Sequence, residues 1–166
     1  MDKTTLEMVI HSLIFSNIDY CVAIFHNLPA YQFHNIQWIQ NYAARILTNT
    51  GKFSHITPVL KELHWFPVQY RIKFKILITT FKCLHDMALE YLSSIINKSF
   101  HYERSLRSSD KKRLIKLMVK DKVGERSFHF SAPSLWNELP YLLTSETSFP
   151  IFKSKLKTYF FNLAFS

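Results

Sequence analysis

Apolar side chains return every three or four positions along most of this chain, the spacing that places them on one face of an α-helix. The first such pattern consists of Leu6, Val9, Ile10, Leu13 and Ile14. It predicts a core helix interrupted at Ser16-Asn17 and followed by a short apolar helix over residues 20–25. Another helix is expected over residues 31–47, with Gly51 just beyond it as a stop signal.

Two helices are expected in the middle of the chain. Thr57 and Pro58 have the character of an N-cap and a first helical turn, and a short apolar face follows at Val59, Leu60 and Leu63. After Pro67 a longer helix is expected to run to Leu84. Its apolar stripe is Ile72, Ile76, Phe81 and Leu84, and its basic residues are Arg71, Lys73, Lys75 and Lys82. This helix is therefore amphipathic and basic.

The pattern changes between residues 97 and 122, where apolar periodicity is lost and basic residues gather. They are Arg104, Arg107, Lys111, Lys112, Arg113, Lys116, Lys120 and Lys122, against Glu103, Asp110 and Asp121. We expect a basic loop over residues 97–113. In residues 114–130 apolar and basic positions alternate and Gly124 precedes a second short run, which predicts a small β-hairpin.

Two helices are expected to close the chain, over residues 133–139 and 149–164, the second with Ser148 as its cap. The apolar face of the last helix is Phe152, Leu156, Tyr159, Phe160 and Leu163. With 166 residues, 48% of them hydrophobic and only two of them glycine, the chain predicts one compact, mainly α-helical domain over residues 1–166. Trp38, Trp65 and Trp136 have apolar neighbours and are expected in its core.

Charge narrows the choice of partner. The formal net charge of +9 favours a polyanion, nucleic acid before a membrane, although basic residues that only solubilise an aromatic-rich surface remain an alternative. The candidate phosphate contacts are Arg71, Lys73 and Lys75 on the basic helix and Arg104, Arg107, Lys111, Lys112 and Arg113 on the loop. For the loop, a merely solvated segment is the competing reading. No apolar stretch reaches the roughly 20 residues that a membrane helix needs.

Residue patterns for catalysis, metal binding or cofactor binding are lacking. The sequence contains no glycine-rich phosphate loop, no H-E-x-x-H, no nucleophile elbow and no cluster of aspartates. Cys21 and Cys83 have no ligand spacing and are expected as small buried hydrophobes in a reducing, intracellular compartment, nucleus or cytoplasm. We therefore expect a protein that is not an enzyme and binds no cofactor.

The middle of the chain also carries a family resemblance. It begins in the run His55-Ile56-Thr57-Pro58-Val59-Leu60-Lys61-Glu62-Leu63-His64-Trp65-Phe66-Pro67-Val68 and continues in Arg71-Ile72-Lys73-Phe74-Lys75-Ile76. This region resembles a segment downstream of the polymerase core in non-LTR (LINE-type) retrotransposon reverse transcriptases of the jockey and chicken-repeat branches. Further matches in the family's order are Asp19-Tyr20-Cys21, Ile39-Gln40-Asn41-Tyr42-Ala43-Ala44-Arg45, Glu90-Tyr91-Leu92-Ser93, Arg104-Ser105-Leu106-Arg107-Ser108-Ser109, Gly124-Glu125-Arg126-Ser127-Phe128, Ala132-Pro133-Ser134-Leu135-Trp136-Asn137-Glu138-Leu139-Pro140 and Phe152-Lys153-Ser154-Lys155-Leu156-Lys157. The chain departs from the family at Asp86 and Leu89, where Gly and Pro are usual.

The resemblance implies the thumb-like region that follows the polymerase, without the magnesium-binding aspartates or the endonuclease domain of the family. Because Met1 falls inside that region, we expect a truncated copy or an open reading frame left from an element. The implied role is to hold template RNA, or the RNA–DNA hybrid, beside the polymerase domain of a full-length protein. The alternatives are a helical protein-interaction domain and a relic without function.

Overall fold

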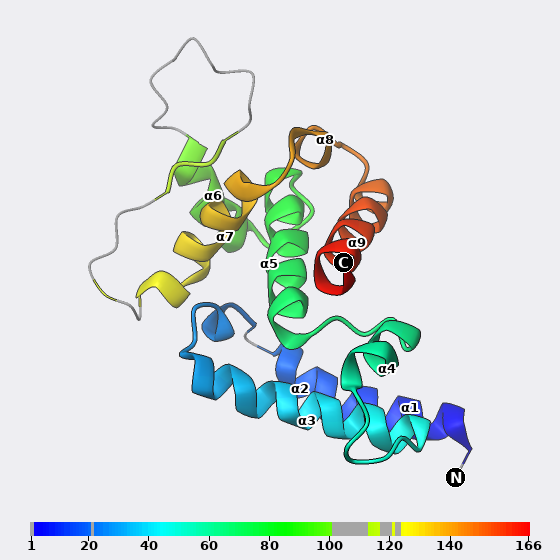
Figure 1. Cartoon of the computed structure of the whole chain (residues 1–166). Coiled ribbons are helices and arrows are strands. Elements are labelled where there is room, and N and C mark those ends of the chain that lie inside the picture. The colour runs from blue at the N-terminus through cyan, green and yellow to red at the C-terminus, as the bar shows by residue number, and fades with distance from the viewer. Residues whose placement is uncertain (1, 21, 101–112, 117–120, 122–123) are drawn as a thin grey trace.

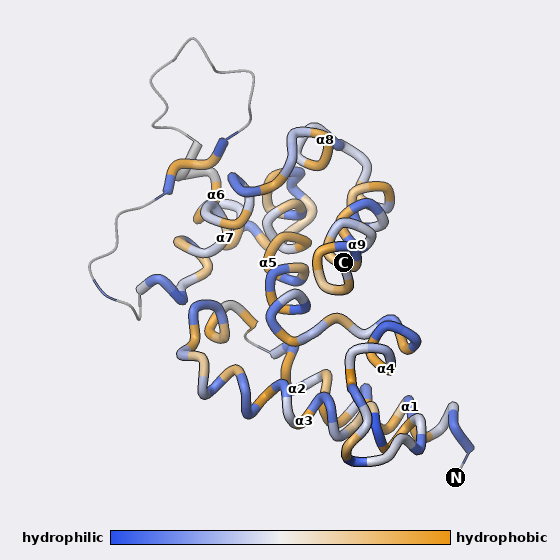
Figure 2. The backbone as a smooth tube through the Cα atoms, in the orientation of Figure 1, coloured by the Kyte–Doolittle hydropathy of each residue, from blue (hydrophilic) through white to orange (hydrophobic). Residues whose placement is uncertain are grey.

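The computed structural model describes residues 2–20, 22–100, 113–116, 121 and 124–166. In these ranges the chain forms helices joined by short connections, and no strand occurs among them (Figure 1). The expectation of a mainly α-helical fold is confirmed. Figure 2 shows hydrophobic and hydrophilic residues interleaved along the helices, as expected for helices that bury one face.

The first helical rod is formed by α1 (Lys3–Ile10), a π-helical turn (His11–Phe15) and α2 (Ser16–Asp19). The expected interruption at Ser16-Asn17 is absent. Ser16 Oγ donates to Ser12 O, and Asn17 Nδ2 donates to Leu13 O at 2.6 Å, so both polar side chains bond back onto the helix.

The π turn changes which side chains of this rod reach the core. Ser16 N–H donates to the carbonyl of His11, five residues earlier instead of four. As a result Ile10 and Phe15 are buried, whereas Leu13, expected on the apolar face, is 64% exposed. The spacing of the apolar residues does not predict this change in which side chains face the core.

The next helices are a 3₁₀ turn (Val22–Phe25), α3 (Ala30–Thr48) and α4 (Ile56–Glu62). The end of α3 is Asn49, which has the left-handed conformation (φ 52°), and not the expected Gly51. His55 precedes α4 without a side-chain cap, and Thr57, expected as that cap, lies within the first turn.

The central helix is α5 (Val68–Leu84), close to the bounds expected from the sequence. It contacts α3, α6 (Glu90–Phe100), α7 (Phe128–Glu138) and α9 (Phe149–Phe165), and Figure 1 shows it in the middle of the molecule. The remaining elements are a 3₁₀ turn (Gly124–Arg126) and α8 (Tyr141–Thr144).

Buried apolar side chains form two clusters. The larger one surrounds α5 and includes Ile72, Phe81, Trp136, Phe152 and Leu156. The smaller one lies between the first rod, α3 and α4, and its largest members are Phe15, Leu47, Leu60 and Trp65. Ile36 of α3 packs against both clusters, so the clusters adjoin at α3.

Two amide side chains of α3 hold the connection between α4 and α5. Gln40 is buried, and its Nε2 donates to Phe66 O at 2.7 Å. The backbone N–H of Val68 donates to Gln37 Oε1 at 2.8 Å. The chain on both sides of Pro67 is thereby satisfied by hydrogen bonds, which a buried backbone requires.

The hairpin expected in residues 114–130 is wrong in its second half, because Phe128 to Phe130 form the first turn of α7. Two or three alternating residues fit a helix start as well as a strand. The basic loop also begins later than expected, since residues 97–100 belong to α6. Most of the loop, residues 101–112, lies outside the described residues.

Asp86, where the resembled family usually has Gly, has a φ of 54°. This left-handed conformation is one that Gly adopts readily and Asp tolerates better than most residues. Asp86 therefore adopts, after α5, a conformation that a glycine at this position would adopt as readily.

Candidate nucleic-acid interface

Of the eight predicted phosphate contacts, Arg71, Lys73, Lys75 and Arg113 are among the described residues. Arg104, Arg107, Lys111 and Lys112 lie outside them. The described four are not brought together into one patch. Arg71 and Lys75 share a carboxylate, and Lys73 lines a polar cavity. Arg113 precedes Leu114, whose backbone is bonded to α7.

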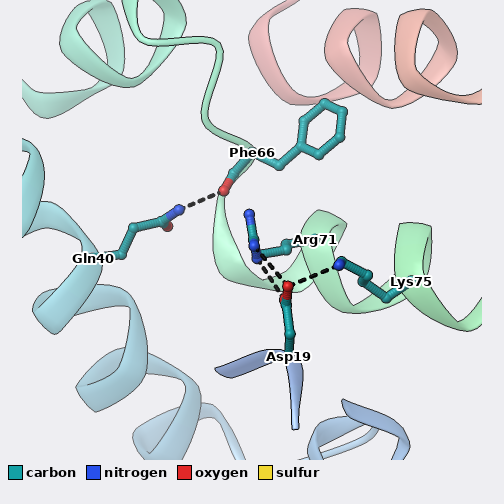
Figure 3. Close-up of polar contacts among 5 residues, drawn as sticks. All are labelled: Asp19, Gln40, Phe66, Arg71 and Lys75. Atoms are coloured by element: carbon teal, nitrogen blue, oxygen red, sulfur yellow. Dashed lines mark hydrogen bonds and ion pairs between the residues drawn. The ribbon is translucent and has the colours of Figure 1, made fainter. Parts of the chain in front are cut away.

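Arg71 and Lys75 both bind Asp19 at the end of the first rod (Figure 3). Arg71 Nε and Nη2 donate to the two oxygens of Asp19 at 2.8 Å each, and Lys75 Nζ lies 2.8 Å from Asp19 Oδ2. The Asp19 side chain is 22% exposed and that of Arg71 is 17% exposed. This fork geometry is the strong form of an ion pair.

The pKa of Asp19 is lowered by this arrangement. Burial alone would raise the pKa of the carboxyl group, but the hydrogen bonds and positive charges of Arg71 and Lys75 outweigh it. The guanidinium of Arg71 also lies over the ring of Phe15, with 4.3 Å between Cζ and the ring centroid. Arg71 thus has a structural role, joining the first rod to α5, and its charge is already compensated.

Lys73 lines a cavity of about 320 Å³ between the 3₁₀ turn Val22–Phe25, α5 and α7. His26, Lys116, Glu125 and Glu138 line it as well. Burial lowers the pKa of His26, and the charge of Lys73 lowers it further, while Glu138 and Glu125 act in the opposite direction. Two lysines and two carboxylates balance here, so the cavity has no net attraction for an anion.

Arg113 is exposed and precedes a residue that is fixed to α7. Leu114 is buried, its N–H donates to Asn137 Oδ1 at 2.9 Å, and Asn137 Nδ2 donates to Leu114 O at 2.7 Å. One amide side chain therefore binds both backbone groups of Leu114. Arg113 also borders a cavity of about 200 Å³ that Tyr141 lines.

Sequence reasoning missed the polar partners and one aromatic pair. Asp19 and Asn137 contact residues 52 and 23 positions away, distances that no local pattern encodes. Trp38, expected in the core, is 59% exposed and stacks on Tyr42, whereas Trp65 and Trp136 are buried as expected. The small residues Ala43 and Ala44 occupy the buried side of α3 instead, and their presence in the sequence was an available signal.

Other kinds of site find little support in the part of the chain that the structure describes. There, no group of three His, Cys, Asp or Glu side chains could hold a metal ion. None of the helices within these ranges combines the length and apolar character that a membrane crossing requires. Cys83 is a buried free thiol, and burial raises its pKa to about 11, so it is a poor nucleophile. Cys21 lies outside the described residues.

Beside these features, comparison with known proteins adds no relative: the chain matches no family model, no curated protein and no solved structure.

Proposed function

We propose that this chain is a non-catalytic nucleic-acid-binding domain that derives from a LINE-type reverse transcriptase. In this role it holds template RNA, or the RNA–DNA hybrid, beside the polymerase domain of a full-length protein. The observation that carries the proposal is the distribution of charge. Residues 98–122 contain nine Lys and Arg against three Asp and Glu, and so contribute +6 of the net charge of +9. Such a density suits phosphate binding with release of counterions.

The attachment of this basic segment supports the proposal. Residues 98–100 belong to α6, which contacts α5 and α7, and Asn137 of α7 binds both backbone groups of Leu114. The described residues on either side of 101–112 are therefore held by the same part of the larger core. Residues that are already anchored lose less conformational entropy on binding.

The roles of the family-like segments also support the proposed origin. Asp19 of one segment binds Arg71 of a second, and the ring of Trp136 in a third segment lies 5.8 Å from the ring of Phe152 in a fourth, centroid to centroid. Residues of the family-like segments thus take part in the contacts between helices, as expected if these segments form one domain in the resembled family as well.

A second candidate is a helical protein-interaction domain. It is favoured by the exposed apolar residues of the first rod and α3, among them Met8, Leu13, Tyr20, Trp38, Ile39 and Ile46. Exposed apolar surface of this kind marks contact sites when it is contiguous. This candidate predicts oligomers in sizing experiments without nucleic acid.

The test is a salt titration of binding to single-stranded RNA, RNA–DNA hybrid and duplex DNA. We expect affinity to fall steeply with salt, and the hybrid or single-stranded RNA to bind more tightly than duplex DNA. Replacing Lys111, Lys112 and Arg113 by Gln should weaken binding to all sequences and reduce the salt slope by about 0.7–0.9 for each lost contact.

A matched control removes the same charge elsewhere, from the exposed Lys3, Lys153 and Lys157. If the control weakens binding as much as the test variant, net charge alone explains the affinity and the segment has no special role. If labelled RNA does not bind at low salt, the proposed function is wrong.

A further inference from the structure

We propose that α3 carries a site for unpaired nucleobases, in which bases stack on Trp38 and Tyr42 and their edges reach the adjoining groove. This inference rests on the proposed function, because it takes nucleic acid as the ligand. It adds a second contact area, on a helix whose residues were expected to serve only the core.

The stacking surface consists of two exposed rings on successive turns of α3. Trp38 is 59% exposed and Tyr42 is 55% exposed. Their ring centroids lie 5.5 Å apart and their planes differ by 15°, so the rings are nearly parallel. Tyr31, also exposed, lies two turns before Trp38 on the same side of the helix. Because the two rings stack on each other, a base of any kind can extend the stack on an exposed face of either ring.

A groove lies on the neighbouring side of α3, and its lining includes neither ring. It has a volume of about 420 Å³ and lies between α3, α4 and the start of α5. Its polar groups include His34, Asn41, Thr57 and Gln69. His34 and Asn41 are four positions before and three positions after Trp38, so they are its neighbours on the helix surface. Amide, imidazole and hydroxyl groups match the donors and acceptors of base edges.

The charge of this region fits a polyanion. Between Asp19 and Glu62 the sequence contains no Asp or Glu, whereas Arg45, Lys52 and Lys61 are basic. Arg45 lies one turn after Tyr42 on α3, and its Nη2 donates to Ser54 O at 3.2 Å. This stretch contains no carboxylate to repel a phosphate, and the guanidinium of Arg45 is held at Ser54 in the connection after α3.

Nucleobases fit this surface better than a protein partner does. Part of the groove is apolar and suits a protein partner as well; this part is lined by Ala30, Phe33, Ile56, Leu60 and Pro67. A base is favoured because it can stack on a ring while its edge bonds to His34 or Asn41, and because residues 20–61 contain no carboxylate to repel its phosphate.

The fluorescence of Trp38 can report on binding at this site. Trp65 and Trp136 are buried, so collisional quenchers reach Trp38 in preference. We expect a single-stranded RNA octamer to quench the tryptophan emission and to protect it from iodide, and a duplex DNA of the same length to do neither. In Trp38→Phe the RNA-dependent quenching should disappear, while the smaller ring still stacks and binding weakens less than in Trp38→Leu.

Affinities are measured with end-labelled octamers. Trp38→Leu and Tyr42→Leu should each weaken single-stranded RNA binding about tenfold, the loss of one stacked base, with no change for duplex DNA and no change in salt slope. Leu142→Ala, at an exposed apolar position on α8, is the control and should bind as the parent chain does. Circular dichroism should show all variants folded, because the replaced side chains are exposed.

The outcomes separate this inference from the proposed function. Salt-dependent RNA binding that Trp38→Leu leaves unchanged would overturn the stacking site and leave the proposed function standing. Absence of RNA binding would overturn both. A concentration-dependent dimer of the parent chain that Trp38→Leu dissociates would assign the rings to a protein contact and overturn the stacking site.

Discussion

At the scale of single residues, Asp19 decides how the first rod meets α5. It lies between Arg71 and Lys75, and Arg71 is in turn covered by Phe15. We expect Asp19→Asn to leave Arg71 partly buried without its counter-charge, which lowers the free energy of unfolding by about 2 kcal/mol, less than the roughly 3–5 kcal/mol of a fully buried pair. Urea unfolding at pH 7 measures this difference.

The same ion pair gives a pH dependence of known sign. The pKa of Asp19 in the fold is below its ordinary value of 3.8, so its contribution to stability is present above that value and is lost as the pH falls through the folded pKa. The stability difference between the parent chain and Asp19→Asn should therefore shrink at acid pH, beginning below about pH 5.

Glu146→Gln is the matched control for this titration. Glu146 also binds a lysine, Lys155, at 2.8 Å, but the Lys155 side chain is largely exposed. Its effect on stability should be clearly smaller than that of Asp19→Asn. Equal effects of the two substitutions would contradict the structural role given to Asp19.

At the scale of elements, Asn137 of α7 binds Leu114, a residue within the basic segment. Asn137→Ala removes both hydrogen bonds to Leu114 and leaves its backbone groups unsatisfied next to the core, a loss of about 2 kcal/mol. Residues 113–116 should then open locally, and limited digestion with trypsin should cut faster after Arg113 and Lys116. Mass spectrometry of the early fragments identifies these cuts.

Asn162→Ala provides the corresponding control, an exposed Asn in α9 replaced by the same residue. It should leave both the stability and the pattern of early cuts unchanged. If Asn137→Ala accelerates cutting everywhere by the same factor, global unfolding and not the release of Leu114 is responsible.

An element can be predicted from the sequence when the residues that determine it lie within the element itself. The helix over residues 31–47 was found within one residue at each end, as α3, because a long run repeats the helical period several times. Phe128 to Phe130 are wrongly predicted as a strand, because three residues cannot distinguish period two from the start of a helix. The exposure of Trp38 escaped prediction for a different reason. The period identifies α3, but its buried side depends on partners in the first rod and α4.

The same distinction holds for the candidate site: some of its features can be predicted from the sequence, and others cannot. Basic residues and their clustering in residues 98–122 are visible in the sequence. The sequence does not show which cations are already neutralised, because Asp19 reaches Arg71 only once α2 and α5 have packed together. The groove beside Trp38 likewise exists only between α3, α4 and α5.

At the scale of the whole molecule, the two core clusters adjoin at Ile36, and the connection around Pro67 is bonded to α3. The expectation of one domain over residues 1–166 requires both clusters to unfold together. Trp65 lies in the smaller cluster and Trp136 in the larger one, so each can report on its own cluster.

Two variants isolate these reporters: Trp38→Phe with Trp136→Phe keeps Trp65, and Trp38→Phe with Trp65→Phe keeps Trp136. For each variant we expect fluorescence and circular dichroism to give one common urea midpoint, as in a two-state transition. Within one variant, a tryptophan signal that changes at a different urea concentration from the helical signal would show that the clusters are separate units.

The π turn of the first rod has a consequence for the length of the chain. Because Ser16 N–H bonds to His11 O over five residues, the segment contains one residue more than an α-helix would need between the same two ends. The π turn is therefore equivalent to a single-residue insertion that the helix accommodates locally. Removing Ser12 should convert this bond to the ordinary four-residue spacing and keep Phe15 and Asp19 in place.

The deletion of Ser12 should therefore leave the urea midpoint unchanged or raise it. A deletion of Asn35, inside the regular α3, should instead rotate the two halves of that helix by about 100° and unfold the chain. Circular dichroism of the two deletion variants distinguishes these outcomes. Tolerance of a shorter chain at the first rod and not in α3 would identify His11–Phe15 as the place where this fold accepts a change in length.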